Sequence, residues 1–130
     1  MLHGMAVNVM DNAYVPYSKF KVGVAIKSVN NKYYVGCNVE NAAYPQGICA
    51  EAGAISAMVA GGCRLISEVL VVSDGDRLIS PCGGCRQKIL EFSKSDTRIF
   101  LATVTEIEKT LSINDLLPFS FDRRFLNFTE

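Results

Sequence analysis

The sequence lacks an excess of charge of either sign, because 13 Lys+Arg balance 13 Asp+Glu and give a formal net charge of zero. A general nucleic-acid binder normally carries a basic surplus, so the balance argues against a protein that grips phosphate backbones. No stretch approaches the roughly 18 consecutive apolar residues that a membrane span requires. Residues 1–10 show neither a basic leader nor a small-residue cleavage site. We therefore expect a cytoplasmic protein with no nucleic-acid or membrane partner.

Histidine is nearly absent, with one residue in 130, whereas cysteine occurs five times. The chain length suits one domain, and 49% apolar with 20% charged residues excludes a disordered chain. A secreted disulfide scaffold would be shorter and would hold an even number of cysteines. The thiols are therefore better explained by metal or redox chemistry in a reducing compartment.

The order of the predicted elements indicates one α/β layered domain over residues 1–130 with a mixed sheet. Alternating or continuous apolar residues predict strands over 20–26, 32–37, 66–72 and 98–102. Helical spacing, Ala-rich composition and end signals predict helices over 2–13, 48–60 and 80–92. The last of these is expected to begin with Ser80 as the cap and Pro81 in the first turn. A final strand and a short helix are expected within 105–117.

The segment Pro81-Cys82-Gly83-Gly84-Cys85 holds two cysteines three residues apart at the start of a predicted helix. At that spacing their side chains are about 60° apart around the helix axis, so both sulfurs can reach one ion. Unpaired backbone N–H groups and the helix dipole favour thiolates there. Taken alone, the pair fits half of a structural zinc site and a redox dithiol equally well.

The segment Cys49-Ala50-Glu51, also at a predicted helix start, can supply a third thiolate near the same point. Three protein ligands leave one position of a tetrahedral ion open, which is the arrangement of catalytic zinc. Glu51 can then handle the protons of a zinc-bound water. Three His/Cys ligands, a glutamate that is not a ligand and a P-C-x-x-C segment form the signature of zinc deaminases.

Five segments, in this order and spacing, resemble the small homotetrameric cytidine deaminases. They are YVPYSKF at 14–20, GCNVEN at 36–41, GICAE at 47–51, SPCGGCRQ at 80–87 and LLP at 116–118. The resemblance implies a three-layer αβα fold with a mixed, roughly five-stranded sheet. It also implies a homotetramer with one Zn²⁺ per subunit, acting in pyrimidine salvage. The implied reaction is hydrolytic deamination of cytidine and 2′-deoxycytidine to uridine and 2′-deoxyuridine with release of ammonia.

The resemblance assigns roles to individual residues as well. The expected zinc ligands are Cys49, Cys82 and Cys85, and the expected proton shuttle is Glu51. The expected substrate contacts are Phe20 against the nucleoside, Asn38 and Glu40 on the ribose hydroxyls, the backbone N–H of Ala50 on the pyrimidine carbonyl, and Tyr44 and Phe121 from neighbouring subunits.

The chain departs from many all-Cys members of that family directly after Cys-Ala-Glu, where it has Ala52-Gly53 in place of Arg-Thr. Three thiolates on one Zn²⁺ leave a net negative charge, which disfavours forming zinc-bound hydroxide. Arg86 and the two helix starts are expected to compensate that charge instead. Otherwise the zinc-bound water stays less acidic. Changing Ala52 to Arg is expected to move the alkaline-favoured limb of the pH–rate profile to lower pH.

Other functions remain open from the residues alone. The chain fits a deaminase of a nucleoside antibiotic such as blasticidin S, or an inactive member of the family. A zinc-stabilised interaction module and a thiol oxidoreductase using Cys82 and Cys85 are the alternatives from other classes.

Two further groups of residues have expected structural roles. Cys37 and Cys63 lack partners at metal spacing and are expected to be small buried apolar residues. The tail has too many aromatic rings for the last strand of a monomer, which favours an interface. Its rings are Phe119, Phe121, Phe125 and Phe128.

Overall fold

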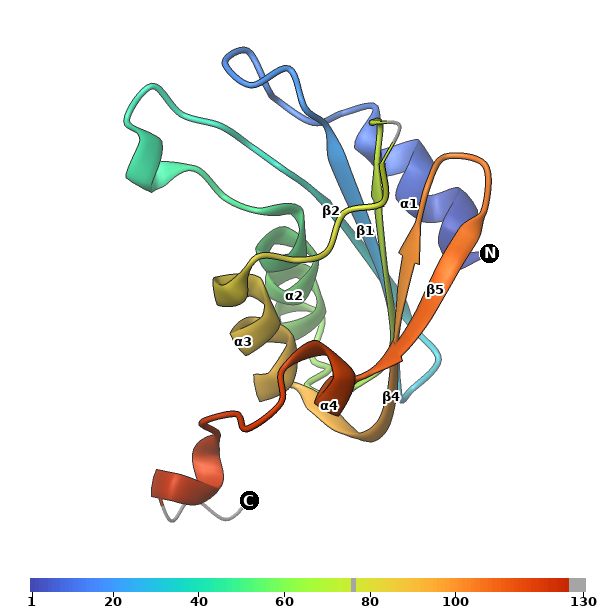
Figure 1. Cartoon of the computed structure of the whole chain (residues 1–130), viewed down its shortest axis with the longest axis vertical. Helices are drawn as coiled ribbons and strands as arrows, with labels where there is room; N and C mark the ends of the chain where they lie inside the picture. Colours follow the sequence, from blue (N-terminus) through green and yellow to red (C-terminus); the bar gives the residue numbers. More distant parts are fainter. Residues whose placement is uncertain (76, 127–130) are drawn as a thin grey trace.

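A mixed five-stranded sheet in the order β2-β1-β3-β4-β5 forms the centre of the computed structural model, which describes residues 1–75 and 77–126 (Figure 1). Its strands are β1 (Val22–Ser28), β2 (Tyr33–Cys37), β3 (Ile66–Ser73), β4 (Ser93–Ala102) and β5 (Ile107–Ser112). β3 and β4 run parallel, and the other neighbouring pairs are antiparallel. The predicted α/β fold with a mixed sheet is confirmed.

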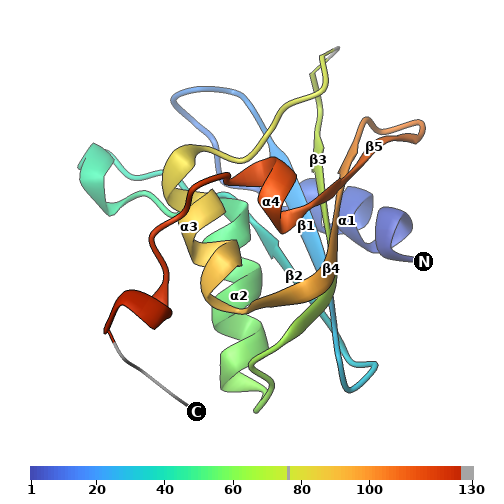
Figure 2. The same ribbon diagram turned by 60° about the horizontal axis from the view of Figure 1, so that its bottom comes forward.

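Helices cover both faces of the sheet, as Figure 2 shows. α1 (Leu2–Met10) packs on one face, whereas α2 (Ala50–Ala60) and α3 (Gly83–Glu91) pack side by side on the other. The short helix α4 (Ile113–Leu116) and the 3-10 turns η1 (Tyr44–Gln46) and η2 (Arg123–Leu126) complete the described elements. The arrangement is the expected three-layer αβα fold.

The two apolar cores lie on opposite faces of the sheet because side chains alternate along each strand. On β1, Val24 and Ile26 join the core beneath α2 and α3, whereas Ala25 joins the core beneath α1. β3 contributes to both cores, with Val69 and Val71 on one side and with Leu70 and Val72 on the other. This double burial explains why residues 66–72 form an almost uninterrupted apolar run.

Two strand glycines allow the helices to approach the sheet closely. A Cβ atom on Gly23 would lie 2.2 Å from the carbonyl oxygen of Ala6 in α1. A Cβ atom on Gly36 would lie 2.4 Å from the backbone nitrogen of Ala54 and 2.5 Å from the carbonyl oxygen of Ala50. Real Cβ atoms essentially never approach other atoms this closely. Gly36 therefore sets the distance between β2 and the first turns of α2.

Several element boundaries differ from the sequence prediction. α3 begins at Gly83 with Cys82 as its N-cap, so the prediction that Ser80 caps this helix was wrong. The Ser80 hydroxyl instead accepts a hydrogen bond from the guanidinium of Arg86 (2.6 Å). α1 ends at Met10 rather than at residue 13, α2 begins two residues later than predicted, and β4 begins five residues earlier.

The cysteines outside the predicted zinc site lie in different environments. Cys63 is buried, as expected, but its surroundings are polar, since its Sγ is 3.3 Å from the Tyr34 hydroxyl and 3.7 Å from Nδ2 of Asn30. Cys37 is half-buried, so its prediction as a core residue was wrong. Within the described residues, no helix has both the length and the apolar character needed to cross a membrane.

Candidate active site

The first turns of α2 and α3 bring three cysteines together. Cys49 is the N-cap of α2, Cys82 is the N-cap of α3, and Cys85 lies in the first turn of α3. Their Sγ atoms all lie within 4.8 Å of one another. Three sulfurs at about 2.3 Å from a tetrahedral zinc ion would be roughly 3.8 Å apart, so a small inward movement completes the site. The donor set and its geometry fit Zn²⁺.

The protonation states of the three thiols differ with their surroundings. Hydrogen bonds from the backbone N–H of Cys85 and, to a lesser extent, of Gly84 lower the pKa of Cys82. Burial raises the pKa of Cys49. Burial, together with the nearby charges of Glu51 and Cys49, raises the pKa of Cys85. A divalent cation at this point would stabilise the thiolate forms that the protein alone disfavours at two of the three positions.

Glu51, the second residue of α2, lies beside this cluster and is only 5% exposed. Burial raises the pKa of its carboxyl group. Hydrogen bonds from its own backbone N–H and from the Cys85 thiol, followed by the charge of Lys88, oppose that rise. A buried carboxyl group next to a metal-binding cluster, with its pKa raised by burial, is suited to general acid–base chemistry.

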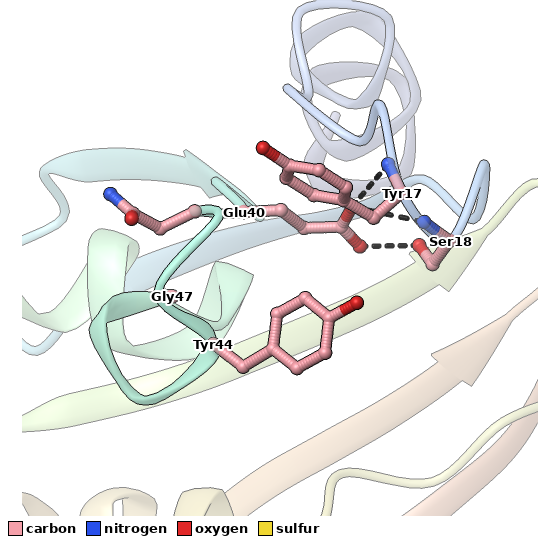
Figure 3. A pocket seen from close by; sticks show the side chains of 6 residues that line it. Tyr17, Ser18, Glu40, Tyr44 and Gly47 are labelled. Carbon is pink, nitrogen blue, oxygen red and sulfur yellow. Dashed lines mark hydrogen bonds between the residues drawn. The ribbon is translucent and has the colours of Figure 1, made fainter.

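A pocket of about 380 Å³ lies beside Glu40, and Figure 3 shows its lining. The Oε1 atom of Glu40 accepts hydrogen bonds from the backbone N–H groups of Tyr17 and Ser18, both at 3.1 Å. Its Oε2 atom accepts a hydrogen bond from the Ser18 hydroxyl. These bonds, with that hydroxyl contributing most, lower the pKa of Glu40 and keep the carboxylate ionised. The volume is that of a small-molecule site.

Asn38 and Phe20 lie beside the start of β1. The Asn38 side chain accepts a hydrogen bond from the Val22 N–H and donates one to the Phe20 carbonyl oxygen, both at 2.9 Å. Asn38 therefore fixes the segment that enters β1, while one amide hydrogen and one oxygen lone pair stay free for another partner. The ring of Phe20 lies against Gly75, where a Cβ would be 3.1 Å from its Cε1 atom.

The three remaining predicted residues, Ala50, Tyr44 and Phe121, lie in three different places. Ala50 is the first residue of α2, where backbone N–H groups have no partner within the helix. Tyr44 lines the Glu40 pocket of its own chain, stands 76% exposed, and meets the ring of Tyr17 edge-on at 6.1 Å. Phe121 lies elsewhere, in a second pocket beside α3, and its carbonyl oxygen accepts a hydrogen bond from Gln87 (2.9 Å).

Arg86 follows the ligand position Cys85 and spans three segments. Its guanidinium donates to the Pro81 carbonyl oxygen (2.9 Å), the Leu116 carbonyl oxygen (2.6 Å) and the Ser80 hydroxyl. These bonds hold the loop before Cys82 against α4, so the residue has a structural role in addition to its predicted electrostatic one. Its compensation of charge at the metal stays a prediction.

Sequence reasoning missed two residues that shape the pocket. Tyr17 and Ser18 anchor the Glu40 carboxylate, although they are 23 and 22 residues away in the chain. Their positions inside the segment 14–20 that resembles the family were the available signal.

Three thiol ligands with an unligated carboxyl group beside them, at paired helix starts above a mixed sheet, define a zinc-dependent hydrolytic deaminase. The family model for the "Cytidine and deoxycytidylate deaminase zinc-binding region" matches residues 1–102. The chain belongs to the cytidine deaminase family.

Individual relatives are similar to this chain in sequence and structure over nearly its whole length. A cytidine deaminase of Sporosarcina psychrophila is 40% identical over 119 residues, which cover 91% of this chain and 87% of the relative. One of Mycobacterium tuberculosis is 38% identical over 122 residues, covering 93% and 87%. The crystal structure of cytidine deaminase from Burkholderia pseudomallei superposes with a TM-score of 0.86 at 38% identity, covering 92% of this chain and 96% of that one.

Proposed function

We propose that this protein hydrolyses cytidine and 2′-deoxycytidine to uridine and 2′-deoxyuridine with release of ammonia, using one zinc ion per subunit. The observation that carries the proposal is the cluster of Cys49, Cys82 and Cys85 with the buried carboxyl group of Glu51 beside it. The relatives named cytidine deaminase support the same reaction. Replacing an amino group at neutral pH needs an activated water and a proton carrier, and these residues provide for both.

Each residue of the site has a step in this reaction. The three cysteines hold the zinc ion, which when bound lowers the pKa of water towards about 7. Glu51 accepts a proton from the attacking water and delivers it to the ring nitrogen N3. It then takes the proton of the new hydroxyl group on C4 and passes it to the amino group, which leaves as ammonia. The Ala50 N–H donates to the pyrimidine carbonyl, and Phe20 contacts the nucleoside. C4 becomes tetrahedral during attack, and the site is expected to bind this shape better than the flat substrate.

The pocket chemistry favours free nucleosides over nucleotides. Glu40 is held ionised by its bonds to Tyr17 and Ser18, so it is a hydrogen-bond acceptor for ribose hydroxyls. Asn38 has one donor and one acceptor position left for the same sugar. The described lining of this pocket holds the Glu40 carboxylate and no lysine or arginine, so it offers a phosphate group a repelling charge and no cation. Phosphorylated substrates are therefore expected to react far more slowly.

We further propose a single domain over residues 1–130 that assembles into a cytoplasmic homotetramer with pockets shared between subunits, acting in pyrimidine salvage without nucleic-acid partners. The single five-stranded sheet supports a single domain. The exposed rings of Phe119, Phe121 and Phe125 support the assembly of subunits, because isolated proteins rarely expose neighbouring aromatic side chains. Phe128, the fourth ring of the predicted interface, lies outside the described residues.

One experiment tests the reaction and its alternatives together. Purified protein is analysed for zinc and assayed for ammonia release from cytidine, with blasticidin S as the parallel substrate. We expect about one zinc per chain and release from cytidine only. Zinc without release of ammonia from either compound would favour an interaction module, and release from blasticidin S alone would favour an antibiotic deaminase. Activity that follows redox state without metal would favour a thiol oxidoreductase.

A further inference from the structure

The zinc centre of this chain would be anionic, so a positive charge outside its ligand set would stabilise it. Three thiolates around a divalent cation carry a net charge of −1, and the buried Glu51 adds another negative charge when it ionises. Ala52, the residue that follows it, brings no charge. Arg86 directs its guanidinium to two carbonyl oxygens and a hydroxyl group.

A second cation, Lys88, also lies beside the ligand turn. Lys88 comes three residues after Cys85 in α3, and side chains on a helix lean towards its N-terminus. A Cβ atom on Gly84 would lie 3.7 Å from the Lys88 Nζ, so the ammonium group stands beside the first turn of the helix. That turn contains Cys85 and follows Cys82 directly. Gly84, one turn before Lys88, has no side chain to displace the ammonium group.

A groove between α2 and α3 contains both Lys88 and Ala52 in its lining. It is lined by Ala52, Ile55, Ser56, Gln87, Lys88, Glu91 and Phe92. The methyl group of Ala52 leaves the groove open, so Lys88 shares the space that a long side chain at position 52 would enter. The charged groups that line this space are Lys88 and Glu91 on α3, and Glu51 on α2 lies within electrostatic range of Lys88.

We propose that Lys88 is the positioning residue that compensates the negative charge of the zinc–thiolate centre, in the space left open by Ala52. The ammonium group lies beside the first turn of α3 and in the groove that Ala52 lines, which places it next to the ligand turn. The inference rests on the proposed function, because it assumes zinc at the three cysteines. Three thiolates on Zn²⁺ form a centre of charge −1, so a nearby cation stabilises the loaded state.

The test compares Lys88→Met with Lys88→Arg, with the double variant Ala52→Arg/Lys88→Met, and with Lys109→Met. Lys109 is an exposed lysine on the edge strand β5, so its replacement controls for the loss of one positive charge. Zinc affinity is measured by competition with a chromophoric chelator, and the pH profile of kcat/KM is measured with cytidine. We expect Lys88→Met to weaken zinc binding about threefold to tenfold and to move the acidic limb of the profile to higher pH.

The other variants decide whether charge is the cause. Lys88→Arg should match the wild type, the double variant should recover most of the loss, and Lys109→Met should change neither readout. Equal zinc affinities and equal pH profiles for Lys88→Met and Lys109→Met would overturn the proposal, as would a loss that Lys88→Arg shares. If the wild type binds zinc but releases no ammonia, the proposed function fails, while the zinc affinities still decide the role of Lys88.

Discussion

Glu51 shows how a single side chain acquires a chemical role from its position. A carboxyl group on an Ala-rich helix is usually solvated, but this one is buried at the start of α2, where burial raises its pKa beside the thiol cluster. Glu51→Gln keeps the size and one acceptor oxygen but removes the proton carrier. We expect turnover of cytidine to fall by about 10²- to 10⁴-fold.

Zinc content and far-UV circular dichroism of Glu51→Gln serve as the controls and should match the wild type. A variant that keeps its zinc and its full turnover would show that another group carries the proton.

Glu40 provides a second prediction, which concerns the pH dependence of stability. Its hydrogen bonds to the Ser18 hydroxyl and to the backbone of Ser18 and Tyr17 lower its pKa from the ordinary value of 4.5. A lowered pKa in the folded state means that the ionised group stabilises the fold above the unfolded-state pKa. This contribution is lost as the pH falls through the folded-state value.

Urea unfolding of the wild type and of Glu40→Gln between pH 3 and pH 8 measures this contribution. The difference in unfolding free energy should be constant from about pH 6 upward and should shrink below about pH 4.5. A difference that does not change across the range would mean that the bonds in Figure 3 are not made by the ionised carboxylate.

At this scale the sequence predicted the ligand cluster well, since the spacing of Cys82 and Cys85 on one helical turn is a local property. It did not predict the residues that hold Glu40, because Ser18 lies 22 residues away and contacts it through the fold. The reach of Lys88 was likewise missed, since it depends on Gly84 one turn earlier and on Ala52 in a neighbouring helix.

At the scale of elements, Gly36 sets the distance between α2 and the sheet. Because a Cβ at this position would meet backbone atoms of Ala50 and Ala54, neither partner can rotate away. Gly36→Ala should push α2 from β2 and carry Cys49 and Glu51 with it. We expect a loss of about 1–3 kcal/mol in the free energy of unfolding, measured in urea, together with weaker zinc binding.

Gly4→Ala is the matched control, because a Cβ on Gly4 in α1 would meet nothing within 4 Å. It should stabilise the protein by roughly 0.5–1 kcal/mol through the higher helix propensity of alanine. If both variants behave alike, the close approach of β2 and α2 does not determine the geometry of the site.

The types of the elements were predictable from periodicity, whereas their ends depended on tertiary contacts. Ser80 and Pro81 form a good local helix start, but Arg86 binds the Ser80 hydroxyl and the Pro81 carbonyl oxygen and keeps this segment extended. Cys82 therefore becomes the N-cap, which places its sulfur next to the N–H groups that lower its pKa. The polar start of β4 was missed because residues 93–97 lack the apolar pattern of a strand.

The order of the strands is a property of the whole molecule that the sequence alone did not provide. Apolar patterns predicted the strands, and β3, which holds the almost uninterrupted apolar run at 66–72, lies in the middle of the sheet. Which face each helix covers follows from long-range packing. The direction of the C-terminal segment, which extends from α4 past α3 in Figure 1, likewise depends on contacts such as that between Gln87 and Phe121.

Phe121 provides the last prediction, which concerns the assembled protein. Its ring stacks on that of Phe125 at 5.3 Å, both rings are exposed, and the pair lies outside the Glu40 pocket of its own chain. If Phe121 completes the pocket of a neighbouring subunit, Phe121→Ala should lose activity while its own Glu51 stays intact. Mixing this variant with Glu51→Gln after dissociation and reassembly should then restore activity, because hybrid assemblies pair an intact Glu51 with an intact Phe121 from another chain. Light scattering of each sample measures the subunit number, for which we expect four. A mixture no more active than its parents, at an unchanged subunit number, would show that Phe121 does not act across the interface.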